Sequence, residues 1–272
     1  MNKGHLDVPG ASLYYEAGGE GPLLLLIPGA NGDGKVFEQI LQPLAERFTV
    51  VVYDRRGFSR SQLLGPQNYE VRLETDADDA RRLIQHLSNS PAIVFGTSSG
   101  AVVALELLIR HPSVVRTLIA HEPPAVNLLP DSEASKWRAF FVDVYETYRK
   151  DGLEAGMFKF VTGVLSREEA GQWRERASSS NGSERNLQNL EYWYEHEVRQ
   201  YTSANLDVTA LAAFSDRLIL AGGRESRECF PYLPNTVLAK EFGLNILELP
   251  GGHLGYALHP EQFAQELRGA LI

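Results

Sequence analysis

Short apolar runs alternate with amphipathic segments along most of the chain. Apolar runs predict strands at 12–16, 22–27, 48–53, 92–95, 114–120, 217–221 and 245–249. Apolar residues at helical spacing predict helices at 70–88, from Gly100 to just before Pro112, at 230–243, and from Pro260 onward. Continuous apolar strands that alternate with helices are typical of a parallel sheet covered on both faces, so we expect an α/β fold.

The alternation lapses between residues 125 and 206, where the pattern is helical throughout. Two apolar faces are predicted there, one formed by Trp137, Phe140, Phe141, Val144, Tyr145 and Tyr148, the other by Leu187, Leu190, Tyr194, Val198 and Tyr201. All three tryptophans of the chain lie in this stretch. We therefore expect a core of residues 1–124 and 207–272, with 125–206 inserted as a helical cap. Most of its rings should pack inside the insert, and a minority should line a pocket against the sheet.

Composition narrows the function classes. The 272 residues include 35 acidic against 26 basic side chains, a formal net charge of −9, which argues against nucleic acid or an anionic membrane as partner. The single cysteine, Cys229, permits no intrachain disulfide and reads as a small apolar filler. No signal-peptide pattern or membrane-length apolar run is present, so a cytoplasmic location is expected.

The segment Gly96-Thr97-Ser98-Ser99-Gly100 interrupts an apolar stretch with small residues. It matches the pattern G-x-S-x-G, follows a predicted strand and opens a predicted helix, which is the context of a nucleophile elbow. A strand that turns directly into a helix needs small neighbours and projects the middle side chain above the sheet. Ser98 is thus the candidate nucleophile. The alternative is an ordinary tight turn with a capping serine.

A serine hydroxyl is a weak nucleophile and needs a base. Of the seven histidines, only His253 lies in a glycine-rich loop after a predicted strand, in "PGGHLGY". The carboxyl ends of parallel strands meet at one sheet edge, so His253 should lie near Ser98. We expect it to be the general base.

A developing oxyanion needs two hydrogen-bond donors. The backbone N–H of Ser99 is one candidate because it opens the helix after the nucleophile. The other should come from the loop "PGANGDG" after the strand at 22–27, where Ala30 is the best position and Gly29 the next. The alternative is that this glycine-rich loop serves only as a turn.

These motifs together resemble those of the α/β-hydrolases. The resemblance covers the core and rests on the G-T-S-S-G elbow, "YDRRGFSRS" at 53–61 and "LPGGHLGYALHPEQFA" at 249–264. Within that superfamily, "GTSSGA", "AHEPP" and the histidine segment are most similar to the zearalenone-lactonase-like branch and its bacterial esterase relatives. The chain departs from the lactonases at Gly29-Ala30, where they carry Asp-Gly. The insert, which would determine substrate choice, shows little clear similarity.

The resemblance leaves two positions for the acid that orients His253. The commoner placement in the superfamily follows the strand at 217–221 and would use Glu225, whereas the lactonase-like placement follows the strand at 114–120 and would use Glu122. Glu122 precedes two prolines that fix the backbone, and Glu225 lies among arginines that could pair with it. We therefore expect Glu122, with Glu225 as the alternative.

The sequence thus predicts a serine hydrolase that cleaves a carboxylic ester or lactone through an acyl-enzyme, with no metal or organic cofactor. Asp54, Arg55 and Arg56 are expected to form an ion-paired turn that supports the loop over the site. The aromatic, lightly charged insert favours an apolar small-molecule substrate. A monomer or a homodimer is compatible with the sequence. The alternatives are a C–C bond hydrolase of the same fold and a receptor-like binding protein with little turnover.

Overall fold

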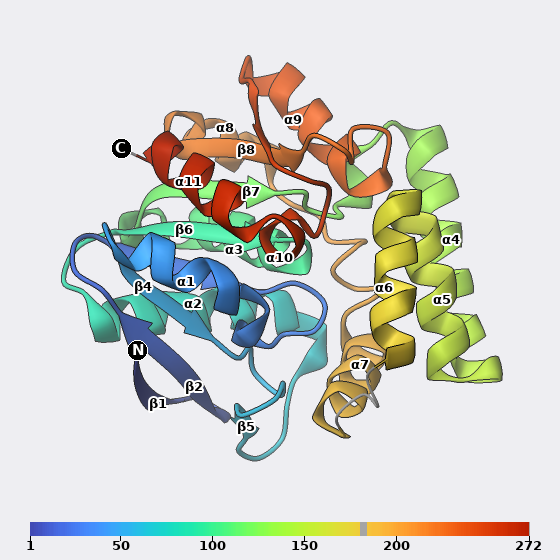
Figure 1. Ribbon diagram of the computed structural model, residues 1–272, viewed down its shortest axis with the longest axis horizontal. Helices are drawn as coiled ribbons and strands as arrows, with labels where there is room; N and C mark the ends of the chain where they lie inside the picture. Colours follow the sequence, from blue (N-terminus) through green and yellow to red (C-terminus); the bar gives the residue numbers. More distant parts are fainter. Residues whose placement is uncertain (180–183, 272) are drawn as a thin grey trace.

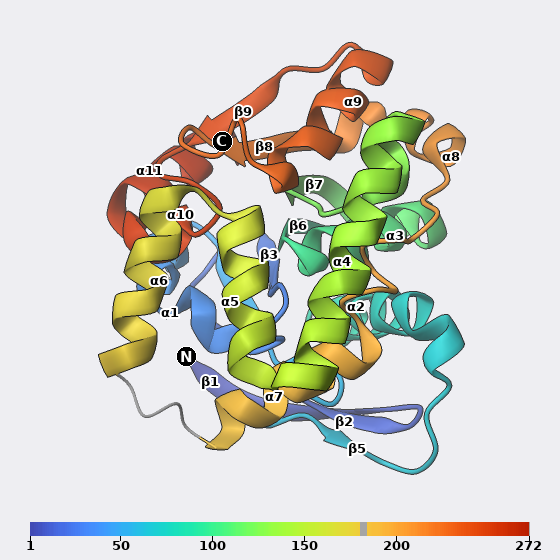
Figure 2. The same ribbon diagram turned by 90° about the vertical axis from the view of Figure 1, so that its right-hand side faces the viewer.

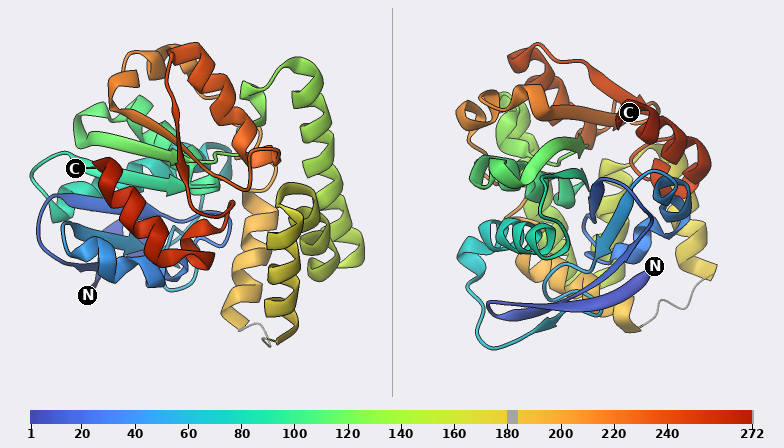
Figure 3. Two further views of the ribbon diagram at one scale, coloured as in Figure 1. Left: turned by 45° about the horizontal axis from the view of Figure 1, so that its top comes forward. Right: turned by 90° about the vertical axis from the view of Figure 1, so that its left-hand side faces the viewer.

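A computed structural model describes residues 1–179 and 184–271 (Figure 1). In this part of the chain one sheet of nine strands has the order β1-β2-β4-β3-β6-β7-β8-β9, with β5 paired to β2. Six neighbouring strands run parallel: β4, β3, β6, β7, β8 and β9. Strands β1, β2 and β5 add antiparallel pairs at one edge (Figure 3). Strands β1 to β9 span, in this order, Asn2–Val8, Ala11–Gly18, Leu23–Ile27, Thr49–Tyr53, Gln62–Leu63, Ala92–Thr97, Val115–His121, Leu218–Gly223 and Ile246–Leu249.

Helices cover both faces of the sheet, as the buried apolar strands require. On one face α2 (Arg72–Leu87), α3 (Ser99–Arg110), α8 (Val208–Ala212) and α9 (Leu233–Phe242) enclose a core with the strands. On the other face α1 (Glu38–Ala45), α10 (Gly255–Leu258) and α11 (Pro260–Leu271) enclose a second core. The predicted α/β class with a mostly parallel sheet is confirmed.

Four helices between β7 and β8 form a separate layer, called the helical insert below: α4 (Asp131–Asp151), α5 (Leu153–Val164), α6 (Arg167–Ser179) and α7 (Glu184–His196). Figures 1 and 2 show them standing together at one end of the sheet, on the side away from both chain termini. Their apolar side chains form a third core with Phe58 and Phe230. The face predicted from Trp137 to Tyr148 packs into this core, whereas Leu187 of the second face is 46% exposed.

Several elements have no counterpart in the sequence prediction, including the short helices α8 and α10 as well as β1, α1 and β5. Strand β1 lies at the sheet edge and is mostly exposed, so it lacks the apolar run that marks a buried strand. Helix α1 contains Pro43, a residue that ordinarily argues against a helix interior. Strand β5 is two residues long. Within the described residues, no helix is both long and apolar enough to cross a membrane.

Candidate active site

Ser98 lies at the turn that joins β6 to α3. Its backbone has φ 54° and ψ −129°, a strained conformation for a residue with a side chain. Its N–H donates to the carbonyl of His121 at 3.0 Å, which ties the turn to the end of β7. Helix α3 begins at the next residue, Ser99, so the Ser98 side chain sits at the N-terminus of a twelve-residue helix. The predicted strand–Ser–helix context is present.

Two glycines permit this turn by letting backbones touch. A Cβ on Gly96 would lie 2.3 Å from the carbonyl oxygen of Gly100, and a Cβ on Gly100 would lie 2.2 Å from that of Ile27. Both distances are far below van der Waals contact, and the obstructing atoms are backbone. The small residues around Ser98 are therefore required for α3 to approach β6 and β3.

Glu122 and His253 form a buried pair beside this turn. The Nδ1–H of His253 donates to Oε2 of Glu122 at 2.6 Å. The other carboxylate oxygen, Oε1, accepts from the N–H of Gly223 at 2.8 Å and from the hydroxyl of Ser226. Glu122 is fully buried, and its backbone has φ 49°. Both oxygens of this buried carboxylate thus have hydrogen-bond donors, which offsets the cost of removing its charge from water.

The electrostatics of the pair favour an ionised carboxylate. Burial raises the pKa of Glu122, but hydrogen bonds from His253 and Ser226 and the charges of the two nearby histidines outweigh it, so the pKa lies below 4.5. For His253 burial lowers the pKa, yet the hydrogen bond and negative charge of Glu122 raise it above 6.5. With Nδ1–H engaged by the carboxylate, Nε2 of neutral His253 is left as the basic nitrogen.

His121 lies one residue before Glu122 but is a packing residue. It is fully buried, its Nδ1 is 2.9 Å from the hydroxyl of Thr97, and its ring stacks on Phe95. Burial lowers its pKa to about 4, so the ring is neutral near pH 7.

A cavity opens between this edge of the sheet and the helical insert. It is lined by Ala30, Ser98, Ser99, Pro124, Phe141, Phe160, Val164, Trp193, Glu197, Val198, Tyr201, Thr202, Phe230, Pro231 and His253. All the residues expected to react or to hold an oxyanion, other than the buried Glu122, therefore share one cavity. Four of its aromatic rings come from the stretch 125–206, the minority that was expected to line a pocket.

Glu225, the alternative acid, is not the partner of His253 Nδ1. Its side chain is exposed, whereas the segment that contains it turns its Gly223 N–H and Ser226 hydroxyl toward Glu122. The loop after β8 thus supplies donors to the carboxylate and not a carboxylate to the histidine. No sequence pattern indicated that Ser226 donates to Glu122, because a serine in such a loop is ordinarily interpreted as a turn residue.

A second carboxylate that the sequence analysis missed reaches the histidine loop from the insert. Glu169 of α6 is 1% exposed, and its Oε1 accepts from the N–H of Leu254 at 2.7 Å. The fit is close, since a Cβ on Gly252 would lie 2.5 Å from Glu169 Oε2. In the sequence, Ser166 and Glu169 have the spacing of a capping box, which marks a helix start. That pattern gives no sign of the contact between Glu169 and the N–H of Leu254.

The expected ion-paired turn is present at 54–61. Asp54 is buried and accepts from Arg60 and from the N–H of Gly34, and Arg56 forms a two-pronged pair with Asp79 at 2.9 Å. Two residues of the turn reach the loop that contains Ala30: Asp54 through the N–H of Gly34, and Arg55 through the carbonyls of Pro28 and Gly29.

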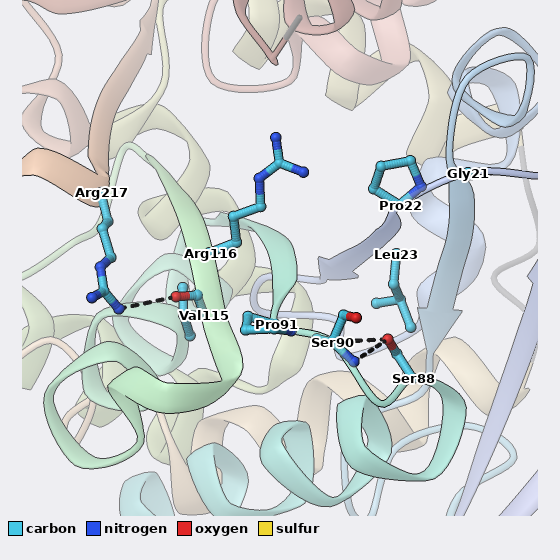
Figure 4. A pocket seen from close by; sticks show the side chains of 9 residues that line it. All are labelled: Gly21, Pro22, Leu23, Ser88, Ser90, Pro91, Val115, Arg116 and Arg217. Atoms are coloured by element: carbon cyan, nitrogen blue, oxygen red, sulfur yellow. Dashed lines mark hydrogen bonds between the residues drawn. The ribbon is translucent and has the colours of Figure 1, made fainter.

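Other candidate chemistry lies apart from this cavity. A hollow at the amino ends of the strands is lined by Gly21, Pro22, Leu23, Ser88, Ser90, Pro91, Val115, Arg116 and Arg217 (Figure 4). It lies at the opposite edge of the sheet from Ser98 and has no histidine or acid among its lining. Burial raises the pKa of Cys229 to about 11, which disfavours a thiolate. Among the described residues, no three His, Cys, Asp or Glu side chains gather to hold a metal ion.

The family model of the alpha/beta hydrolase fold matches residues 22–223. The chain belongs to this family. A Bacillus subtilis (strain 168) protein described as the uncharacterized hydrolase YraK is 38% identical, over 100% of this chain and 96% of its own length. A zearalenone hydrolase of Bionectria ochroleuca is 29% identical, over 94% of this chain and 92% of its own length. These matches assign the chain to the hydrolases of the α/β-hydrolase family.

Solved structures of this fold agree with the architecture. The enol-lactonase from Burkholderia xenovorans LB400 superposes with a TM-score of 0.75 at 17% identity, covering 98% of this chain and 99% of that one. At that identity the likeness shows the shared fold alone.

The backbone contact at Gly100 generates a stability prediction. Gly100→Ala should lower the free energy of unfolding by about 1–3 kcal/mol, because the new methyl overlaps a carbonyl of β3. Gly269→Ala is the matched control: this glycine is in a helix with open space around it, so alanine should raise the free energy by about 0.5–1 kcal/mol. Urea unfolding followed by circular dichroism measures both. Equal effects of the two substitutions would contradict the proposed close approach.

Proposed function

We propose that the protein is a serine hydrolase that cleaves a carboxylic ester or lactone of an apolar small molecule through Ser98, His253 and Glu122. The observation that carries the proposal is the buried Glu122–His253 hydrogen bond next to a strained serine at a strand-to-helix turn. A carboxylate that fixes the tautomer of an imidazole near a serine hydroxyl that lines a cavity is the arrangement acyl transfer needs. The names of the relatives, a zearalenone hydrolase among them, support ester or lactone chemistry.

The reaction follows from these positions. Nε2 of His253 takes the hydroxyl proton of Ser98 as the serine oxygen attacks the carbonyl carbon, and Glu122 stabilises the imidazolium that forms. The tetrahedral intermediate collapses when His253 returns the proton to the leaving alcohol oxygen. A water molecule, deprotonated by the same nitrogen, then attacks the acyl-enzyme and releases the acid and free Ser98.

The backbone N–H groups of Ala30 and Ser99 are proposed as the oxyanion donors. Both residues line the cavity beside Ser98. Gly29 lies against the nucleophile, since a Cβ there would be 2.8 Å from that of Ser98. In the described part of the chain, no protein acceptor is bonded to the Ala30 N–H, so it is free to bind a substrate oxygen.

The helical insert is proposed to act as a cap that selects the substrate. The insert side of the cavity presents Phe141, Phe160, Val164 and Trp193, which favour an apolar acyl or alcohol group. The one carboxylate among the lining residues, Glu197, is engaged by arginines and offers little to a charged ligand. A neutral aromatic or aliphatic ester or lactone matches this surface.

Removal of the nucleophile tests the proposal directly. Wild-type protein should hydrolyse a short p-nitrophenyl ester with a burst of p-nitrophenol, and Ser98→Ala should lose at least about 10³-fold in turnover. Ser88→Ala, at the far hollow, is the matched control and should keep wild-type rates. Tight ligand binding by wild-type protein without any turnover would favour the receptor-like alternative, and cleavage of diketones but not esters would favour the C–C hydrolase.

The acid is tested by a pair of isosteric substitutions. Glu122→Gln keeps the shape but removes the charge that orients and stabilises protonated His253, so kcat should fall by about 10²–10⁴-fold. Glu225→Gln changes an exposed side chain and should leave kcat within about twofold. Steady-state ester hydrolysis measures both, and a larger loss for Glu225→Gln would overturn the assignment.

The pH dependence follows from the raised pKa of His253. Protonated His253 cannot accept the serine proton, so kcat/KM should rise with pH through an apparent pKa above the ordinary value of 6.5. In Glu122→Gln the charge of Glu122 no longer raises the pKa of His253, so the residual activity should titrate at a lower pH than in wild type. A rate profile measured for both proteins tests this, and a shift in the opposite direction would refute the role of Glu122.

A further inference from the structure

Arg55 lies fully buried behind the loop that contains Ala30. Its Nε donates to the carbonyl of Pro28 at 3.0 Å, and its Nη2 donates to the carbonyl of Gly29 at 2.8 Å. The same guanidinium pairs with both carboxylate oxygens of Glu197, at 2.8 and 2.7 Å. Nη1 also donates to Asp76 at 2.9 Å. One planar group thus joins the loop after β3 to the first residue after α7.

The carbonyl that Arg55 holds belongs to the peptide unit whose N–H is that of Ala30. In a planar trans peptide the C=O and N–H point in opposite directions. The Gly29 oxygen is fixed on the Arg55 side, where it also accepts from the N–H of Gly32 at 2.9 Å. The Ala30 N–H is therefore directed to the other side, where Ala30 and Ser98 line the cavity. A cation on the carbonyl also polarises the peptide and makes its N–H a stronger donor.

The guanidinium of Arg55 belongs to a buried cluster of ion pairs that restricts its movement. Arg55, Arg72, Asp76 and Glu197 are all almost fully buried, with two positive and two negative charges in contact. Burial lowers the pKa of Arg55, but Glu197 and Asp76 more than reverse that, so the guanidinium stays charged. Such a cluster is stable only when its geometry is well satisfied, which leaves Arg55 little freedom to move.

We propose that Arg55 is a positioning residue for the oxyanion hole, held by Glu197 so that the Ala30 N–H faces the developing negative charge. The inference rests on the proposed function and extends it. The ion pair between Arg55, after β4, and Glu197, after α7, thereby orients the Ala30 N–H, which would stabilise the transition state. Lysine cannot replace the arginine, because a single ammonium does not span two carbonyls and a carboxylate.

The test compares Arg55→Lys with Arg56→Lys. Arg56 is the matched control: it is adjacent and buried, pairs with Asp79, and donates to Gln67 and to the carbonyl of Pro9. None of these side-chain hydrogen bonds reaches the loop that contains Ala30. For each protein kcat and KM for a p-nitrophenyl ester, the inhibition constant of phenylboronic acid, and the melting temperature are measured. The boronic acid forms a tetrahedral adduct with a reactive serine and reports on transition-state binding.

Arg55→Lys should lower kcat by about 10–100-fold with little change in KM, because a displaced oxyanion donor costs somewhat less than a deleted one. The boronate inhibition constant should rise by a similar factor. Arg56→Lys should change both by less than about threefold even where it lowers the melting temperature as much. Equal kinetic losses in the two variants, or an unchanged boronate constant in Arg55→Lys, would overturn the proposal.

Glu197→Gln is the second variant should Arg55→Lys not fold. It keeps the size of the side chain and leaves Arg55 in place with a weaker partner, so kcat and boronate affinity should fall together by a smaller factor. Unchanged values would overturn the proposal. A wild-type protein that neither turns over esters nor binds the boronate would instead remove the proposed function, and this inference with it.

Discussion

The close approach of α3 to the ends of β3 and β6 sets the geometry of the whole site. Because Gly100 touches the carbonyl of Ile27, the helix can begin directly after the strand, and Ser98 is forced into its strained backbone conformation. The same contact places the loop after β3 beside the serine, with Gly29 against its side chain. One backbone contact thus fixes the hydroxyl, the helix N-terminus and the loop that contains Ala30.

Buried charge is the second constraint, and it is met with donors drawn from distant parts of the chain. Glu122 stays ionised in the core because one oxygen has His253 and the other has a backbone N–H and Ser226. Removing any one of these would leave part of a buried carboxylate unpaired, which costs more than the hydrogen bond itself contributes. The segment after β8 therefore contributes to the site without providing an acid.

The sequence predicted the repeating part of the fold and the positions of Ser98 and His253 beyond strand ends, while their roles stay a proposal. Buried strands have a clear apolar signal, and Ser98 and His253 lie where strands end, so pattern alone located them. Glu122 came from the family resemblance, since spacing by itself left Glu225 open. Edge strand β1 and helix α1 escaped because exposure and Pro43 remove the usual signals. The contacts of Glu169 and Glu197 were not predictable, because a carboxylate in or next to an amphipathic helix is expected to be solvated until its tertiary partners are known.

Those two carboxylates, one on α6 and one at the first residue after α7, give the chain between β7 and β8 a role beyond lining the cavity. Glu169 holds the loop of His253 through the N–H of Leu254, and Glu197 holds Arg55 against the loop of Ala30. Both are buried acceptors, and the loss of either would leave a charged or polar partner unsatisfied. These two buried acceptors therefore connect the chain between β7 and β8 to both loops that the proposed reaction uses.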